Sequence, residues 1–162
     1  MIYWDLDGVL RYLAKVVWNK DPETWNCKTQ DHLSIFDVIR MKPQLLIEAP
    51  ETEYIGVAKK QKELLILSSQ PEHWRTLTEL WIATHLPDIH IDITFTENSL
   101  EKLQYLRQGD YLIEDYPLFP DYSQIILIDR RYNKNVNAPI RVSTPEQLER
   151  IINELKGVNI QV

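Results

Sequence analysis

The sequence predicts an α/β protein with a central parallel sheet and a small, mainly helical segment inserted after the first strand. Short, almost continuous apolar runs recur along the chain. Such runs are typical of strands that are buried on both faces of a parallel sheet. Helical patterns separate several of these runs, as crossovers between parallel strands require. A long segment without such a run separates the first two strands.

Five apolar runs are the predicted strands. They are Ile2–Trp4, Leu64–Leu67, Ile91–Phe95, Tyr111–Ile113 and Ile125–Ile128. We expect the sheet domain to contain residues 1–10 and 60–162, with residues 11–59 as the insert.

Helices are expected after the second and third strands. Pro71 can start the first of them, and its apolar side chains recur at helical spacing: Trp74, Leu77, Leu80 and Trp81. The second helix is indicated by Leu100, Leu103 and Leu106.

The last helix has the clearest signals at its ends. Thr144 is the expected N-cap, Pro145 the first helical residue and Gln147 the residue that completes a capping box. Gly157 marks the expected end. The buried stripe consists of Leu148, Ile151, Ile152 and Leu155.

Helical patches within the insert are expected near Ser34–Arg40 and Pro43–Ala49, and the first helix of the sheet domain at about Thr52–Lys62. Ligands of open α/β sheets bind outside the carboxyl ends of the strands. We therefore expect the insert to cover the site. Its aromatic residues are interpreted as a small core rather than a surface that stacks on bases: Trp18, Trp25 and Phe36.

The composition limits the partners. The net charge of −6 argues against a protein that wraps duplex nucleic acid or coats an anionic membrane. The apolar runs are too short to span a bilayer. Cys27 is the single cysteine, so no internal disulfide forms and a reducing, cytoplasmic location is expected.

Polar side chains follow the first four predicted strands, whose carboxyl ends share one edge of the sheet. They are Asp5 and Asp7, then Ser68 and Ser69, then Lys102 in the next helix, then Glu114 and Asp115. We expect these groups to share one pocket. Several carboxylates in a dry site need a cation, and hard oxygen ligands suit Mg²⁺. Lys102 and a serine hydroxyl would bind phosphate oxygens.

Four motifs in order resemble those of the haloacid dehalogenase superfamily of phosphotransferases. They are "DLDGVL" at residues 5–10, "ILSS" at residues 66–69, Lys102, and "IEDYP" at residues 113–117. The resemblance implies a Rossmann-like three-layer fold with a cap insert after the first strand.

A finer resemblance points to the deoxyribonucleotidase-like branch. It rests on "SSQP" at residues 68–71 and on "ILIDRRYNK" at residues 126–134, which contains Tyr132 and Asn133. Two residues depart from that branch. Gln70 stands where an arginine is usual, and Glu114 replaces the first of two aspartates.

The resemblance implies a mechanism. Asp5 attacks phosphorus and becomes a phosphoaspartate, while Asp7 protonates the leaving alcohol and then activates water. Mg²⁺ is held by Asp5, by the backbone carbonyl of Asp7, and by Asp115 or Glu114. The implied phosphate-binding residues are Ser68, Ser69 and Lys102.

The sequence therefore favours a Mg²⁺-dependent phosphomonoesterase, with (deoxy)ribonucleoside 5′-monophosphates as the expected substrates. Alternatives stay open: a phosphatase for polynucleotide ends or for another small phosphorylated metabolite, and a non-catalytic binding module on the same fold. The expected partners are a small phosphorylated substrate and, through the aromatic insert, a second copy of the chain. At single residues, the serines could cap a helix and Lys102 could be a solvated helix lysine.

Overall fold

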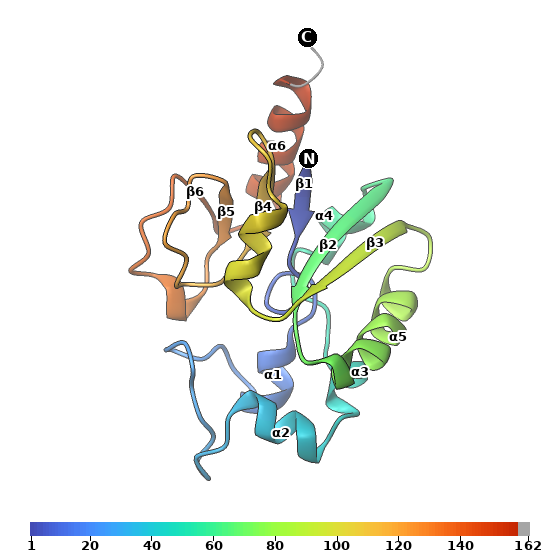
Figure 1. Ribbon diagram of the computed structural model, residues 1–162, viewed down its shortest axis with the longest axis vertical. Coiled ribbons are helices and arrows are strands. Elements are labelled where there is room, and N and C mark those ends of the chain that lie inside the picture. Colours follow the sequence, from blue (N-terminus) through green and yellow to red (C-terminus); the bar gives the residue numbers. More distant parts are fainter. Residues whose placement is uncertain (159–162) are drawn as a thin grey trace.

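The computed structural model describes residues 1–158 and contains one six-stranded, all-parallel sheet (Figure 1). The strands are β1 (Ile2–Trp4), β2 (Glu63–Ser69), β3 (His90–Thr96), β4 (Tyr111–Glu114), β5 (Ile125–Ile128) and β6 (Ile140–Val142). Their order across the sheet is β3-β2-β1-β4-β5-β6. The α/β class and all five predicted strands are confirmed.

The strand β6 was not predicted from the sequence. It has only three residues, Ile140–Val142, and the central one is Arg141. The Arg141 guanidinium donates to the carbonyl oxygens of Asn133 and Val136. A strand this short and with a polar centre has no recognisable apolar run, so only its pairing with β5 defines it.

Helices connect these strands. The α-helices are α1 (Leu13–Trp18), α2 (Ile35–Met41), α3 (Leu45–Glu48), α4 (Ile55–Lys59), α5 (Arg75–His85) and α6 (Pro145–Val158). The 3₁₀ helices are η1 (Glu72–Trp74), η2 (Ser99–Tyr105) and η3 (Arg131–Asn133). The expected helices of the insert and the helix after Pro71 are therefore present.

The helix expected around Leu100, Leu103 and Leu106 is a 3₁₀ helix, η2, rather than an α-helix. Apolar residues at a strict spacing of three fit the three residues per turn of a 3₁₀ helix. The Asn98 side chain caps it by accepting from the backbone N–H of Glu101. The leucine spacing therefore indicated a helix but not its type.

The ends of α6 follow the expected signals closely. Thr144 Oγ1 accepts from the backbone N–H of Gln147. The Gln147 side chain reaches back to the backbone N–H of Ser143, one residue before the N-cap. The helix passes Gly157 and ends at Val158.

Two apolar layers cover the sheet. On one face, alternate strand residues such as Ile66 and Ile113 pack with Val57 of α4, Trp81 of α5 and Leu148 of α6. On the other face, a second cluster is packed against η2 and the segment between β4 and β5; it consists of Leu67, Leu112, Phe119, Ile125 and Leu127. The second covering layer is thus a 3₁₀ helix and a loop rather than long helices.

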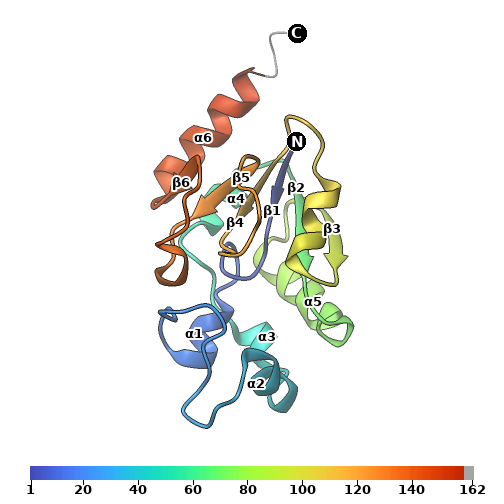
Figure 2. The ribbon, with the colours of Figure 1, turned by 60° about the vertical axis from the view of Figure 1, so that its left-hand side comes forward.

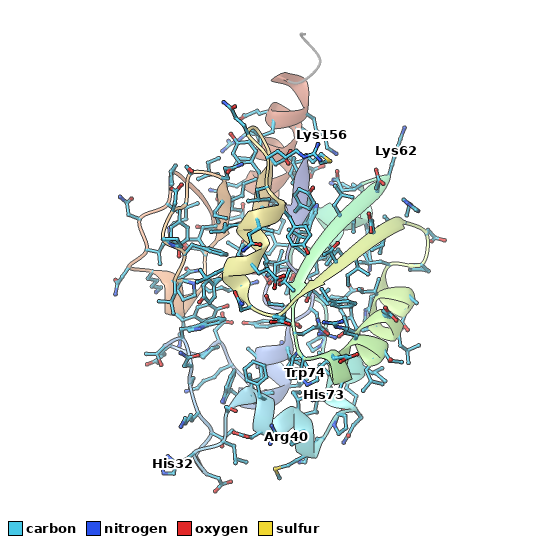
Figure 3. The ribbon with its side chains drawn as sticks, viewed as in Figure 1. His32, Arg40, Lys62, His73, Trp74 and Lys156 are labelled. Atoms are coloured by element: carbon cyan, nitrogen blue, oxygen red, sulfur yellow. The ribbon has the colours of Figure 1, made fainter. Side chains whose placement is uncertain are left out.

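The helices α1, α2 and α3 lie beyond the carboxyl ends of the strands (Figure 2). Their small core is formed by Leu13, Ile39, Leu46 and Ala49 together with Trp74 from η1. Figure 3 labels Trp74 where the sheet domain meets this insert. The helix α4 packs in the core of the sheet instead, so residues 55–59 lie with the sheet domain and not with the insert.

The chain changes direction across the sheet at β1. Trp4 of β1 is in register with Ile66 of β2 on one side and with Ile113 of β4 on the other. The residues that follow these three strands therefore meet at one edge, which is the position at which open α/β sheets bind ligands. Among residues 1–158, no helix combines the length and apolar character needed to cross a bilayer.

Candidate active site

A cavity of about 670 Å³ lies between the carboxyl ends of the strands and the insert. Six of the seven residues that the sequence assigned to one pocket line it: Asp5, Asp7, Ser69, Lys102, Glu114 and Asp115. The roof comes from residues of the insert. The cavity therefore lies at the edge of the sheet where the sequence predicts a pocket.

Three carboxylates converge on the floor of this cavity. Asp5 follows β1, Glu114 ends β4 and Asp115 comes next, and each offers an oxygen within 4.8 Å of the others. All three residues are buried. Carboxylate oxygens at this spacing could hold a divalent cation, and hard oxygen ligands suit Mg²⁺.

Lys102 lies between two of these carboxylates. Its Nζ donates to Asp5 Oδ1 at 2.5 Å and to Glu114 Oε2 at 2.6 Å. The lysine side chain is only 2% exposed, so Lys102 is not a solvated helix lysine. The 3₁₀ helix η2 carries it to the cluster from the second face of the sheet.

The charges in the cluster perturb one another. Burial and the Glu114 carboxylate raise the pKa of Asp5 well above its ordinary value, against the effect of Lys102. Burial and the same carboxylate raise the pKa of Asp115 to about 8. Burial alone would raise the pKa of Glu114, but Lys102 holds it below its ordinary value.

The pKa of Lys102 is raised, because Asp5 and Glu114 outweigh the burial that alone would lower it. Three carboxylates therefore face one ammonium group. Such a cluster has a deficit of positive charge, which either protons or a metal ion can offset.

A sharp turn brings the backbone beneath the cluster. Gly8 has a φ of +92°, a left-handed conformation that glycine adopts at little cost. The Gly8 carbonyl accepts from Arg130 Nη2 at 2.7 Å and from Arg130 Nε at 3.1 Å. Arg130 is itself paired with Glu53 at 2.7 Å. The turn after β1 is thus held by a buried arginine that follows β5.

Asp7 does not join the three-carboxylate cluster. Both of its oxygens accept from Arg11, Oδ1 from Nε at 2.6 Å and Oδ2 from Nη2 at 2.9 Å. The Arg11 side chain is fully buried, whereas that of Asp7 is 26% exposed and lines the cavity. The expected metal contact through the backbone carbonyl of Asp7 stays a prediction.

The two serines that end β2 point to opposite faces of the sheet. Ser68 is buried and its Oγ accepts from Gln70 Nε2 at 2.7 Å, while Ser69 Oγ lies 2.7 Å from Thr96 Oγ1. Ser69 and Gln70 line the cavity; Ser68 is not among its described lining residues. In the described hydrogen bonds neither serine caps the following helix.

Tyr132 and Asn133 of η3 hold the loop after β4. The Tyr132 hydroxyl donates to Asp115 Oδ2, and Asn133 Nδ2 donates to the Asp115 carbonyl at 2.9 Å. Burial and the Asp115 carboxylate raise the pKa of Tyr132 well above its ordinary value. The position of Asp115 is therefore set by two residues of a single short helix.

The aromatic residues of the insert were expected to form its core, but Trp18, Trp25 and Phe36 all line the cavity and none of them belongs to the described apolar cluster of the insert. Trp25 is 38% exposed and Phe36 is 51% exposed, and both line the cavity. Trp25 makes an edge contact with Tyr116 at 5.3 Å between ring centroids, and Phe36 stacks on Trp74 at 5.4 Å. Smaller aliphatic residues fill the core of the insert and leave these rings at the wall.

Comparisons with known proteins give no family for this chain. No protein-family model matches the sequence. No curated protein matches it either. The site is therefore interpreted from its own geometry and from the motifs in the sequence.

Arg11, Thr78 and Arg130 are site residues that the sequence analysis missed. The sequence analysis placed Arg11 at the start of the insert and Arg130 within "ILIDRRYNK" but gave neither a role, and it did not single out Thr78. All three are buried. The sequence signal that could have found Arg11 is its position four residues after Asp7, a spacing at which the two side chains also pair here.

Proposed function

We propose that the protein is a Mg²⁺-dependent phosphomonoesterase that works through a phosphoaspartate on Asp5. The observation that carries the proposal is the buried cluster of Asp5, Glu114 and Asp115 with Lys102 at its edge. Carboxylates around a divalent cation, with a lysine beside them, form a site for a phosphoryl group. The order of the four motifs, which resembles that of haloacid dehalogenase phosphotransferases, supports the same reaction.

The donors in this cluster fit Mg²⁺, because all of them are hard carboxylate oxygens. Asp5, Glu114 and Asp115 would hold the ion. When bound, the ion would offset negative charge on the phosphoryl oxygens.

The residues of the chain would carry the covalent chemistry. An oxygen of Asp5 bonds to phosphorus while the bond from phosphorus to the leaving oxygen breaks. Asp7 delivers a proton to that leaving oxygen and later takes one from the water that releases phosphate from Asp5. Lys102, which touches Asp5 at 2.5 Å, would bind a phosphoryl oxygen, as would the hydroxyl of Ser69, which lines the cavity.

The proposed substrates are small, with nucleoside monophosphates as the best candidates. The cavity of about 670 Å³ is covered by the insert, which suits a small molecule. Its exposed aromatic rings, Trp25 and Phe36, offer flat apolar surface to the leaving group. The single cysteine, Cys27, supports a reducing, cytoplasmic location within this proposal.

The test is phosphate release from a panel of nucleoside monophosphates, sugar phosphates and an aryl phosphate, with Mg²⁺ and with EDTA. Asp5→Asn should abolish Mg²⁺-dependent release, because an amide cannot act as the nucleophile. Asp88→Asn, at an exposed position, is the matched control and should keep wild-type rates. Release that persists in Asp5→Asn would refute the phosphoaspartate, and a folded wild-type protein without release would refute the phosphatase.

A further inference from the structure

A chain of hydrogen bonds joins Asp7 to Ser68 through three side chains from separate parts of the fold. Asp7 accepts from Arg11 at 2.6 and 2.9 Å. Arg11 Nη1 donates to Thr78 Oγ1 of α5 at 3.1 Å. Thr78 Oγ1 lies 2.6 Å from Gln70 Oε1, and Gln70 Nε2 lies 2.7 Å from Ser68 Oγ.

The bonds of this hydrogen-bond chain run in one direction from Arg11 to Ser68. A guanidinium group only donates, so the Thr78 hydroxyl accepts from Arg11, and it donates its own hydrogen to Gln70 Oε1. The amide nitrogen of Gln70 is then the end that donates to Ser68. Ser68 accepts this bond and keeps its hydrogen for another acceptor.

Apart from Asp7, every residue of this hydrogen-bond chain is buried. The exposed fractions are 0% for Arg11 and Thr78, 1% for Ser68 and 3% for Gln70. A broken link would leave a buried polar group without its partner, which costs more than the bond contributes when made. Arg11 also donates to the Leu46 carbonyl at 3.2 Å. The same guanidinium therefore connects the hydrogen-bond chain to α3 of the insert.

The geometry points to Arg11, Thr78 and Gln70 as positioning residues that fix the Asp7 carboxylate and the Ser68 hydroxyl relative to each other. This assignment rests on the proposed function, in which Asp7 moves a proton and the end of β2, where Ser68 precedes Ser69, holds a phosphoryl oxygen. It also gives Gln70 a defined role. Gln70 must accept from Thr78 and donate to Ser68, and an amide does both whereas a guanidinium cannot accept.

The kinetic test uses two substitutions of one residue. Thr78→Val keeps the shape but removes the hydroxyl, and Thr78→Ser keeps the hydroxyl. For the best substrate of the phosphate-release panel, Thr78→Val should lower kcat about tenfold or more with KM changed less than about twofold, because small misplacements of reacting groups are costly. Thr78→Ser should restore most of kcat.

The matched control lies on the same helix. Thr84 is exposed and its hydroxyl donates to the Leu80 carbonyl at 2.8 Å, so Thr84→Val should leave kcat and KM unchanged. An unchanged kcat in Thr78→Val, or an equal loss in Thr78→Ser, would overturn the positioning role.

A second arm needs no turnover. Urea unfolding would give the unfolding equilibrium constants of four proteins: wild type, Asp7→Asn, Thr78→Val and the double variant. Together they form a double-mutant cycle. Since Arg11 links the two sites, the effects should depart from additivity by about fivefold or more. Additivity to within about twofold would show that the hydrogen bonds do not couple Asp7 to Thr78, and would overturn the proposal.

Gln70→Met replaces Thr78→Val in this cycle if Thr78→Val does not fold, with the same expectation. The two proposals can fail separately. A wild-type protein without phosphatase activity refutes the proposed function, while the unfolding cycle still decides whether the chain couples Asp7 to the residues behind Ser68.

Discussion

Gly8 and Asp115 lie so close together that a Cβ on residue 8 would stand 1.8 Å from Asp115 Oδ2. The turn after β1 and the carboxylate after β4 thus occupy space that only glycine leaves free. Gly8→Ala should displace Asp115 and strain a backbone with φ of +92°, costing about 1–3 kcal/mol of unfolding free energy. Urea unfolding and Mg²⁺ titration would measure this, with weaker Mg²⁺ binding expected.

Gly56→Ala is the control for that substitution. Gly56 lies in α4, and a Cβ there would meet nothing within 4 Å. Alanine in a helix should be neutral or stabilise the protein by up to about 1 kcal/mol. Equal losses for the two glycine variants would show that the contact with Asp115 is not the cause.

Lys102→Met should be among the most destabilising single substitutions in the site. It would leave Asp5 and Glu114 buried without the ammonium group that both contact. Removal of one partner from a buried ion pair costs about 3–5 kcal/mol, which urea unfolding at neutral pH in EDTA would detect. Lys62→Met, at an exposed position, should change stability by less than about 0.5 kcal/mol. A small effect of Lys102→Met would contradict the buried pairing.

The stability of the metal-free protein should depend on pH through Asp115. Burial and Glu114 raise its pKa from 3.8 to about 8 in the folded state. Between the unfolded and the folded pKa, the folded state binds a proton that the unfolded state has lost. The stability from this proton is complete below the unfolded pKa and is lost as pH rises through the folded pKa. Stability in EDTA should therefore fall between pH 6 and 8, by at most about 1.4 kcal/mol per pH unit for one proton.

Asp115→Asn should reduce this pH dependence, because asparagine does not titrate, while Asp5, whose pKa is also raised, should keep part of it. Thermal unfolding in EDTA at several pH values would compare the variant with wild type. Identical slopes in the two proteins would show that Asp115 is not the group that takes up the proton.

Mg²⁺ should stabilise the protein, and more strongly at pH 8 than at pH 6, because the ion competes with protons for Asp5 and Asp115. At a hundred times its Kd the ion would add about 2.7 kcal/mol, a rise of several degrees in Tm. Glu114→Gln should reduce the rise. Glu63→Gln, at an exposed position, should not. A rise that is the same in all three proteins would place the ion elsewhere.

The local parts of the fold were predictable from the sequence. The apolar run Ile125–Ile128 is β5 residue for residue, and Thr144 caps α6 as its sequence signal indicates. Such features depend on neighbours in the chain, so periodicity and end signals are enough to find them. The short strand β6 and the 3₁₀ character of η2 depend on pairing and packing, and were not predicted.

The sequence by itself determined which residues stand at the ends of the strands, and so placed Asp5, Glu114 and Lys102 near one another. Only the tertiary structure decided the partner of each side chain. Ser68 and Ser69 are adjacent in sequence, yet consecutive strand residues face opposite sides of a sheet, so one bonds to Gln70 and the other to Thr96.

Asp7 shows the same division. The sequence shows that Asp7 stands close to Asp5. The geometry of its pairing with Arg11 depends on α5 and the insert, because Thr78 and the Leu46 carbonyl accept from the same guanidinium. A side-chain hydrogen bond requires two groups within about 3 Å. The spacing of four residues brings Asp7 and Arg11 close together. The direction in which the guanidinium points depends on Thr78 and Leu46, which lie far away in the chain, and no local pattern encodes it.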